Sequence, residues 1–145
     1  MAKKFQFRLE SLLRIRTHKV EEAKEALNEI IQARLKKKRE IQEREEQIQA
    51  AHAHRGGKSS RPVGELQAVW HHVESLRDQI KMLEQEYSQL GEIETLRREI
   101  LSEAMKKEKV LEKLKEKKQV QHGADIAREE QLFLDDIAQR KVSQL

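Results

Sequence analysis

Residues 52–64, HAHRGGKSSRPVG, decide the fold of this chain. They hold three of its five glycines and its only proline, Pro62, while the segments on both sides are long and rich in charged residues. Glycine and proline clustered in this way break helices and favour turns. The stretch is therefore either a linker between two independent segments or the bend at which one helical segment folds back on another.

The composition of the 145 residues favours long helices over a wide globular core. Charged residues make up 39% and aromatic residues 3%, and the mean hydropathy is -0.89. So few large apolar side chains suit either a disordered chain or helices joined along a narrow apolar seam. The chain has no cysteine, no apolar run near the roughly 18 residues that span a bilayer and no signal-peptide pattern at its start. We expect a cytoplasmic protein.

Heptad spacing indicates coiled-coil helices on both sides of the stretch. After it, apolar residues alternate spacings of three and four: Leu66, Val69, Val73, Leu76, Ile80, Leu83, Tyr87 and Leu90. A weaker repeat covers residues 13–48. Both have the 3.5-residue period of a coiled coil, which excludes a disordered chain. Beyond residue 90 the apolar stripe moves to Ile93, Leu96 and Ile100, which predicts a local change of winding beside Gly91.

An antiparallel hairpin would set the a positions of one helix opposite the d positions of the other. This holds throughout if the numbers of facing residues sum to 117, which centres the turn between Lys58 and Ser59. We therefore predict an all-α fold, a two-helix antiparallel coiled-coil hairpin with an overhanging C-terminal helix. Within a single coiled-coil domain of residues 1–145, the expected boundaries are about 5–53 for helix 1, about 54–64 for the tip loop and about 65–143 for helix 2.

In this register the second helix extends beyond the start of the first helix. Its overhang of about 30 residues would be roughly 45 Å long at 1.5 Å per residue, and Gly123 is a candidate hinge within it. Past this glycine an apolar stripe has no partner in the hairpin: Ile126, Phe133, Leu134, Ile137 and Ala138. An unpaired apolar stripe on a protruding helix predicts docking on another protein.

The sequence carries no motif for catalysis. It lacks HExxH, CxxC, the phosphate-binding GxxxxGK[ST] and GxSxG, and a convex hairpin offers no pocket for converging polar groups. Among the six histidines, His52 and His54 would point to opposite sides of a helix, so a solvated loop is simpler than a metal site. The basic runs at residues 36–39 and 106–118 have no interleaved aromatic residue for base stacking. We expect no enzyme activity, no catalytic residue, no metal, no cofactor and no nucleic-acid ligand.

Two terminal motifs resemble those of the flagellar export protein FliJ family. The first is FQFRLESLLRIRTHKVEEAKEAL at residues 5–27, with the pattern F-x-F-R-L-E-x-L-L-x-x-R. The second is LDDIAQRK at residues 134–141, with the pattern L-D-[DE]-[IF]-A-x-R. Length and layout are similar to the family over the whole chain.

The resemblance implies a non-enzymatic component of the bacterial flagellar type III protein export apparatus. Its implied partners are the hexameric export ATPase, in whose ring the hairpin would be seated as a stalk, the export-gate membrane protein FlhA, and export chaperones that it would escort. The resemblance also implies a protein that is cytoplasmic, peripherally attached to the membrane at the flagellar base, and a monomer on its own.

Carried over by position, the resemblance implies two binding sites. The ATPase-ring site would comprise Phe7, Leu9, Leu13, Arg16, Phe133, Leu134, Asp135, Ile137, Ala138 and Arg140. The export-gate site would comprise Trp70, His72, Val73, Leu76 and Ile80. Trp70 lies beside the seam, where it would either anchor a partner or cover the tip loop near Pro62.

Two other functions fit the same residues. One is a structural coiled coil that forms a parallel homodimer, with residues 52–64 as a flexible joint. The other is a coiled coil that binds nucleic acid or a membrane surface through its basic runs.

Overall fold

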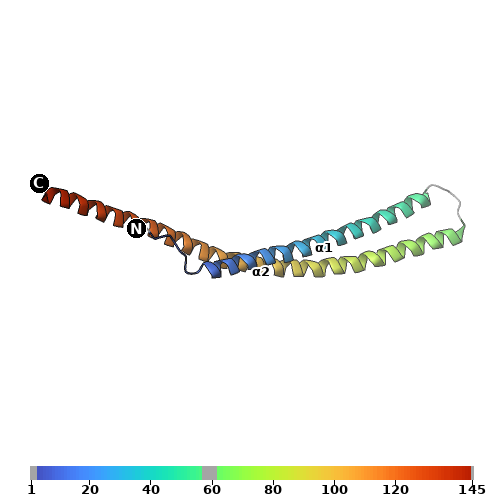
Figure 1. The fold of residues 1–145 in the computed structure, drawn as a ribbon. Helices are drawn as coiled ribbons and strands as arrows, with labels where there is room; N and C mark the ends of the chain where they lie inside the picture. Colours follow the sequence, from blue (N-terminus) through green and yellow to red (C-terminus); the bar gives the residue numbers. More distant parts are fainter. Residues whose placement is uncertain (1–2, 57–61, 145) are drawn as a thin grey trace. The chain divides into compact units, whose positions relative to one another are not determined.

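The structure, a computed structural model, describes residues 3–56 and 62–144 and contains two long α-helices. Helix α1 spans Glu10–Gly56 and helix α2 spans Val63–Ser143. The helices pack against each other as an antiparallel hairpin (Figure 1). The predicted all-α class and the hairpin are confirmed, so the stretch HAHRGGKSSRPVG holds the turn. Of the predicted tip loop at about 54–64, residues 54–56 belong to α1 and residues 63–64 to α2. Residues 57–61 lie outside the described residues.

The helix ends differ from the predicted boundaries by a few residues. Helix α1 begins at Glu10 instead of residue 5, with the Glu10 amide donating to the carbonyl of Phe7 at 3.1 Å. Helix α2 begins just after Pro62, whose carbonyl accepts the amides of Glu65 at 3.0 Å and Leu66 at 3.3 Å. A proline at a helix start loses no hydrogen bond, because the first amides of a helix have no intrahelical acceptor.

The chain divides into two compact units, and both helices contribute to each. We call residues 22–101 the turn unit, and residues 1–21 with residues 102–145 the terminal unit.

The turn unit has a narrow core along one seam between α1 and α2. Its buried side chains are Ala23, Leu27, Ile30, Val73 and Leu76. Past Leu90 the seam of α2 keeps its heptad spacing through the half-buried Glu94, Arg97 and Leu101. The predicted change of winding is therefore wrong: α2 is continuous there, and the apolar residues 93, 96 and 100 stand outside the seam with 39%, 59% and 60% of their surface exposed.

The register of the hairpin differs from the predicted one by about one heptad. Three contacts between the helices of the turn unit define it: Arg97 Nη1 to the carbonyl of Ala26 at 2.5 Å, Lys37 Nζ to Glu86 Oε2 at 2.6 Å, and Arg44 Nε to Gln79 Oε1 at 2.8 Å. The residue numbers in each contact sum to 123, and the nearest register that pairs a with d sums to 124. A slide of seven residues keeps every a position opposite a d position, so periodicity alone does not separate 117 from 124.

In the terminal unit, Leu13 and Val20 of α1 and Leu111 of α2 are buried. Residues 3–9 form a non-helical arm ahead of α1. Helix α2 continues to Ser143 and runs unbroken through Gly123, so the predicted hinge is absent. From residue 127 to residue 144 every side chain is exposed, which confirms the overhanging C-terminal helix.

Candidate functional site

The overhanging helix of the terminal unit presents large apolar side chains to solvent. Their exposed fractions are 63% for Leu132, 66% for Phe133, 58% for Leu134 and 36% for Ile137. Ile126, one helical turn beyond His122 on α2, is half-buried. Single exposed apolar residues are common on protein surfaces, but four on a helix that no other described segment covers are typical of a binding surface.

The angular positions of these residues separate the predicted ring-site residues into two groups. At about 100° per residue, Phe133 and Ile137 lie about 40° apart on the helix, and Arg140 lies within about 60° of Ile137. Asp135 lies about 160° from Ile137, on the opposite side. It accepts a hydrogen bond from Gln131 Nε2 at 3.1 Å, one turn earlier. Such i, i+4 contacts add a few tenths of a kcal/mol each to a solvated helix.

The predicted ring-site residues near the N-terminus are less accessible. Leu13 is 8% exposed and packs in the core of the terminal unit. Phe7, Leu9 and Arg16 are half-buried, and the first two belong to the arm instead of to a helix. The accessible residues of the predicted ring site are therefore those of α2: Phe133, Leu134, Asp135, Ile137, Ala138 and Arg140.

The arm is held on α2 through His122. The ring of Phe5 packs on the imidazole with centroids 5.5 Å apart and a tilt of 51°, and Nε2 of His122 is 2.8 Å from the carbonyl oxygen of Lys3. Along the arm, Phe5, Phe7 and Leu9 are half-buried while Lys4, Gln6 and Arg8 are exposed. Through residue 7 this alternation is typical of extended backbone, whose successive side chains point to opposite faces. Residues 8–9 form a turn that leads into α1.

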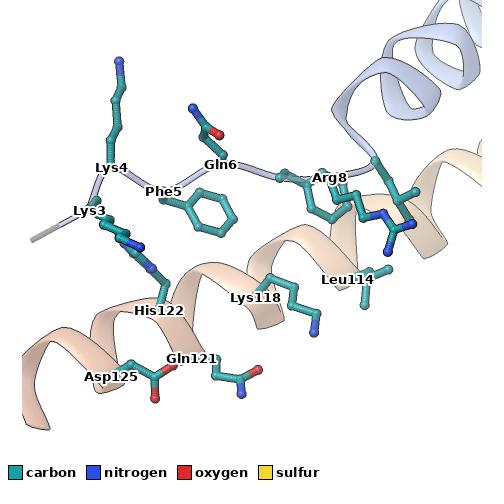
Figure 2. A pocket seen from close by; sticks show the side chains of 12 residues that line it. Lys3, Lys4, Phe5, Gln6, Arg8, Leu114, Lys118, Gln121, His122 and Asp125 are labelled. Atoms are coloured by element: carbon teal, nitrogen blue, oxygen red, sulfur yellow. The ribbon is translucent and has the colours of Figure 1, made fainter.

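A groove with a volume of about 740 Å³ lies between the arm and α2 (Figure 2). Residues 3–9 line one side, and the other side is lined by Leu114, Lys118, Gln121, His122 and Asp125. The groove was not predicted, because residues 5–9 were assigned to a helix, although Phe7 and Leu9 of its lining belong to the predicted ring site. The spacing of two between Phe5, Phe7 and Leu9 was the signal for an extended arm.

The predicted gate residues do not form one exposed patch. Trp70 is 57% exposed, with the ring of His71 edge-on at 5.2 Å, and His72 is exposed. Val73 and Leu76 are 4% and 3% exposed and belong to the core of the turn unit. Because Trp70 and His72 are two residues apart, they lie about 160° apart around α2.

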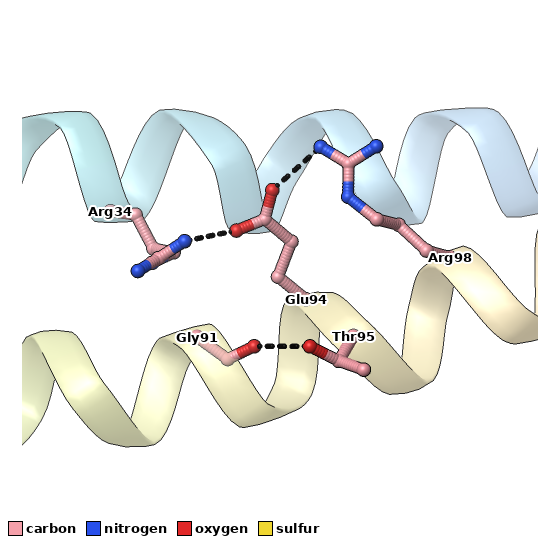
Figure 3. Close-up of polar contacts among 5 residues, drawn as sticks. All are labelled: Arg34, Gly91, Glu94, Thr95 and Arg98. Atoms are coloured by element: carbon pink, nitrogen blue, oxygen red, sulfur yellow. Dashed lines mark hydrogen bonds and ion pairs between the residues drawn. The ribbon is translucent and has the colours of Figure 1, made fainter.

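A polar cluster crosses the seam of the turn unit at Arg34 (Figure 3). Glu94 accepts hydrogen bonds from the guanidinium groups of Arg34 and Arg98, the latter at 2.8 Å. The guanidinium of Arg34 lies 4.2 Å from the ring centroid of Tyr87, and its Nε is buried without a hydrogen-bond partner. The hydrogen bond from Arg34, followed by that from Arg98, holds the pKa of Glu94 below its ordinary value of 4.5.

Gly91 makes room for this cluster. A methyl group at its Cα would lie 3.1 Å from Nη2 of Arg34, closer than ordinary van der Waals contact. Thr95 Oγ1 donates to the carbonyl of Gly91 at 3.1 Å. Polar residues within a coiled-coil seam fix the register of the helices at a cost in stability. The cluster around Arg34 fixes the register of α1 and α2 in the turn unit in this way.

Among the described residues, no three or more histidine and carboxylate side chains gather into a group that could hold a metal ion. Neither helix contains, within the described ranges, a segment long and apolar enough to cross a membrane.

Comparison with protein families identifies one match. The family model described as "Flagellar FliJ protein" matches residues 5–144, nearly the whole chain. Comparisons with curated proteins and with solved structures gave no match.

Proposed function

The chain belongs to the flagellar FliJ family and is thus a structural component of the flagellar export apparatus, and we propose that it serves there as a non-enzymatic stalk seated in the ring of the hexameric export ATPase. In this role the stalk couples the ring to the export-gate membrane protein FlhA and escorts export chaperones. It works on the cytoplasmic side, peripherally attached to the membrane at the flagellar base.

The observation that carries the proposal is the unpartnered stripe of Phe133 and Ile137 on the overhanging helix. Full burial of one large apolar side chain contributes about 1.5–3 kcal/mol. Burying Phe133, Leu134 and Ile137 in the ATPase ring would therefore contribute a binding free energy typical of interface hot-spot residues, which cluster together as these three do on one helix.

A single helix within a ring of six subunits makes unequal contacts with them. Phe133 and Ile137 lie on one side of α2, whereas Asp135 lies on the other side. The subunits that face the apolar side would be stabilised in one conformation relative to the others, because a ligand shifts an equilibrium by its differential affinity for the states. The stalk would thus make the subunits of the ATPase ring differ in conformation without catalysing a reaction itself.

We propose that the gate partner binds through Trp70, an exposed member of the predicted gate site. His72, the other exposed member, lies about 160° away around α2 and contributes only if the partner reaches around the helix. Val73, Leu76 and Ile80 would act indirectly, since their packing in the seam holds α2 in place. Trp70 is the anchor, because exposed tryptophans at interfaces are frequent hot spots.

The experiment is a pull-down of the hexameric export ATPase with the wild-type chain and with a chain that ends at His122. Removal of residues 123–145 leaves the arm and its contact with His122 intact. We expect the truncated chain to bind at least tenfold more weakly, as does the Phe133→Ala, Ile137→Ala double variant. Leu96→Ala is the matched control, because Leu96 is exposed to a similar extent, 59%, and lies in the turn unit. Wild-type binding by the truncated chain would refute the proposal.

A further inference from the structure

Four cationic side chains line the groove between the arm and α2 without a carboxylate partner. They are Lys3, Lys4, Arg8 and Lys118, and none makes an ion pair within the described part of the chain. A nearby lysine shows the contrast: Nζ of Lys115 is 2.9 Å from Glu10. Asp125 is the only carboxylate in the lining. The groove therefore carries an excess of three positive charges that the terminal unit leaves unneutralised.

The floor of the groove is apolar. Phe5, Phe7 and Leu9 are half-buried on the arm side, and Leu114 is half-buried on α2. In Figure 2 the ring of Phe5 lies between the arm and the part of α2 that bears Lys118 and His122. A ligand that meets both features must combine negative charge with an apolar side chain.

The backbone of the arm is also available. Among the described residues, none of the amides of residues 3–9 donates a hydrogen bond to another backbone carbonyl, and only the carbonyls of Phe7 and Leu9 accept from backbone amides, those of Glu10 and Leu13. Extended backbone with free amides pairs readily with an extended peptide, whose main chain supplies affinity while its side chains supply specificity.

We propose that this groove binds an acidic segment of a partner protein, in an extended conformation and with a bulky apolar residue at its centre. The carboxylates of the segment pair with Arg8 and Lys118, which border the groove on opposite sides, and the apolar residue rests on Phe5 and Leu114. Phe7 and Leu9 of the floor also belong to the predicted ring site, but the four cations, Phe5 and Leu114 do not. The proposal and its test therefore do not depend on the ring proposal.

A peptide fits these features better than a nucleic acid does. The ring of Phe5 is half-buried and packs at a tilt on His122, so its exposed part suits one apolar side chain better than the row of stacked bases that single-strand binders hold. A carboxylate of the protein, Asp125, lies in the lining, where it would repel a continuous phosphate backbone but leaves room for spaced acidic side chains.

The test uses the full chain and a fluorescein-labelled peptide, Glu-Glu-Phe-Leu-Glu-Glu, with binding followed by fluorescence anisotropy at 50 and 200 mM salt. Peptides with glutamine or lysine in place of glutamate are the ligand controls. We expect the acidic peptide to bind more weakly at the higher salt concentration and to bind at least tenfold more tightly than either control peptide. Phe5→Ala should raise the Kd about fivefold and leave the salt dependence unchanged.

The decisive comparison is between two pairs of charge reversals of equal net charge. Arg8→Glu with Lys118→Glu should raise the Kd at least tenfold. Lys109→Glu with Lys113→Glu, exposed on α2 outside the groove lining, should change it less than threefold. If circular dichroism shows lost helicity in the first pair, Arg8→Gln with Lys118→Gln makes the same comparison with a milder change.

Four results would overturn the proposal. The first is an equal loss of affinity in both pairs, which would mean a diffuse basic surface. The second is equal binding of the glutamine peptide. The third is tighter binding of single-stranded DNA than of the acidic peptide at the same groove. The fourth is a dimer in sedimentation that the peptide dissociates and the first pair abolishes, which would identify a second copy as the occupant.

Discussion

Replacing Leu76 by alanine should lower the free energy of unfolding by about 3 kcal/mol. Leu76 is 3% exposed in the seam of the turn unit, so the substitution removes nearly a whole buried side chain. Leucine-to-alanine changes in cores cost about 2–5 kcal/mol. A two-helix seam can close partly around the gap, which places this site in the lower half of that range.

Urea unfolding followed by circular dichroism measures the effect. With a slope of about 1.5 kcal/mol per molar urea, a loss of 3 kcal/mol moves the midpoint by about 2 M. The slope itself should stay constant, since the surface that unfolding exposes changes little. The same curve recorded at two protein concentrations would separate a monomer from a dimer.

Leu96→Ala is the matched control, because it is the same substitution in the same helix and the same unit. Leu96 is 59% exposed, although its spacing from Ile93 and Ile100 predicted a place on the seam. We expect a change of less than about 0.5 kcal/mol, the usual range for surface positions. Equal losses for Leu76→Ala and Leu96→Ala would refute the reasoning, since both residues would then have to be packed.

Three further outcomes concern the polar cluster and its surroundings. Gly91→Ala should stabilise the chain by less than the roughly 1 kcal/mol that alanine gains over glycine within a helix, because the new methyl group meets Arg34 at 3.1 Å. In an Arg34→Ala background, urea unfolding should show the full gain of about 1 kcal/mol. The pKa of Glu94 is lowered by its hydrogen bonds from Arg34 and from Arg98. The contribution of this carboxylate to stability is therefore present above pH 4.5 and is lost as the pH falls through the lowered pKa. In Glu94→Gln, the free energy of unfolding should fall less steeply with decreasing pH. The pKa of Lys37 is raised above 10.5, chiefly by its hydrogen bond to Glu86. The contribution of this ammonium group to stability is therefore present below pH 10.5 and is lost as the pH rises through the raised pKa. In Lys37→Met, the free energy of unfolding should fall less steeply at alkaline pH, and an unchanged slope would contradict the ion pair between Lys37 and Glu86.

The heptad repeat was sufficient to predict the hairpin. The spacing from Leu66 to Leu90 and the glycines around Pro62 predict two helices and a turn, because apolar seams and helix breakers act locally. The register depends on long-range polar contacts such as Lys37 with Glu86, which no periodicity encodes. A slide of one heptad left the seam unchanged, and the predicted register was wrong by about that amount.

Residues 90–104 show how polar residues can hide a seam. Glu94 and Arg97 occupy positions that face α1, since each has a partner across the hairpin: Glu94 binds Arg34, and Arg97 binds the carbonyl of Ala26. The apolar pattern therefore placed the seam at Ile93, Leu96 and Ile100, which are exposed. Charged residues that pair across the seam could have been found only with the register already known.

The candidate sites were predicted unevenly. The exposed stripe at Phe133 and Ile137 followed from its having no partner of suitable spacing, a property that the sequence alone displays. The heptad repeats place Leu13 and Val73 on the seam, where the structure buries them. The resemblance assigned the same two residues to binding sites, because it transfers residues by position without their burial. The groove beside Phe5 requires the arm to lie on α2, which is a tertiary contact.

Site-specific photo-crosslinking tests the central claim, that the exposed stripe of the overhanging helix contacts the export ATPase, most directly. A photoreactive phenylalanine replaces Phe133, Asp135 or Leu96 in turn, and adducts with the hexameric ATPase are counted by mass spectrometry. The account predicts a strong adduct at position 133, a weaker one at position 135 on the opposite side of the helix, and background at position 96. Background at position 133 with a strong adduct at position 96 would contradict it.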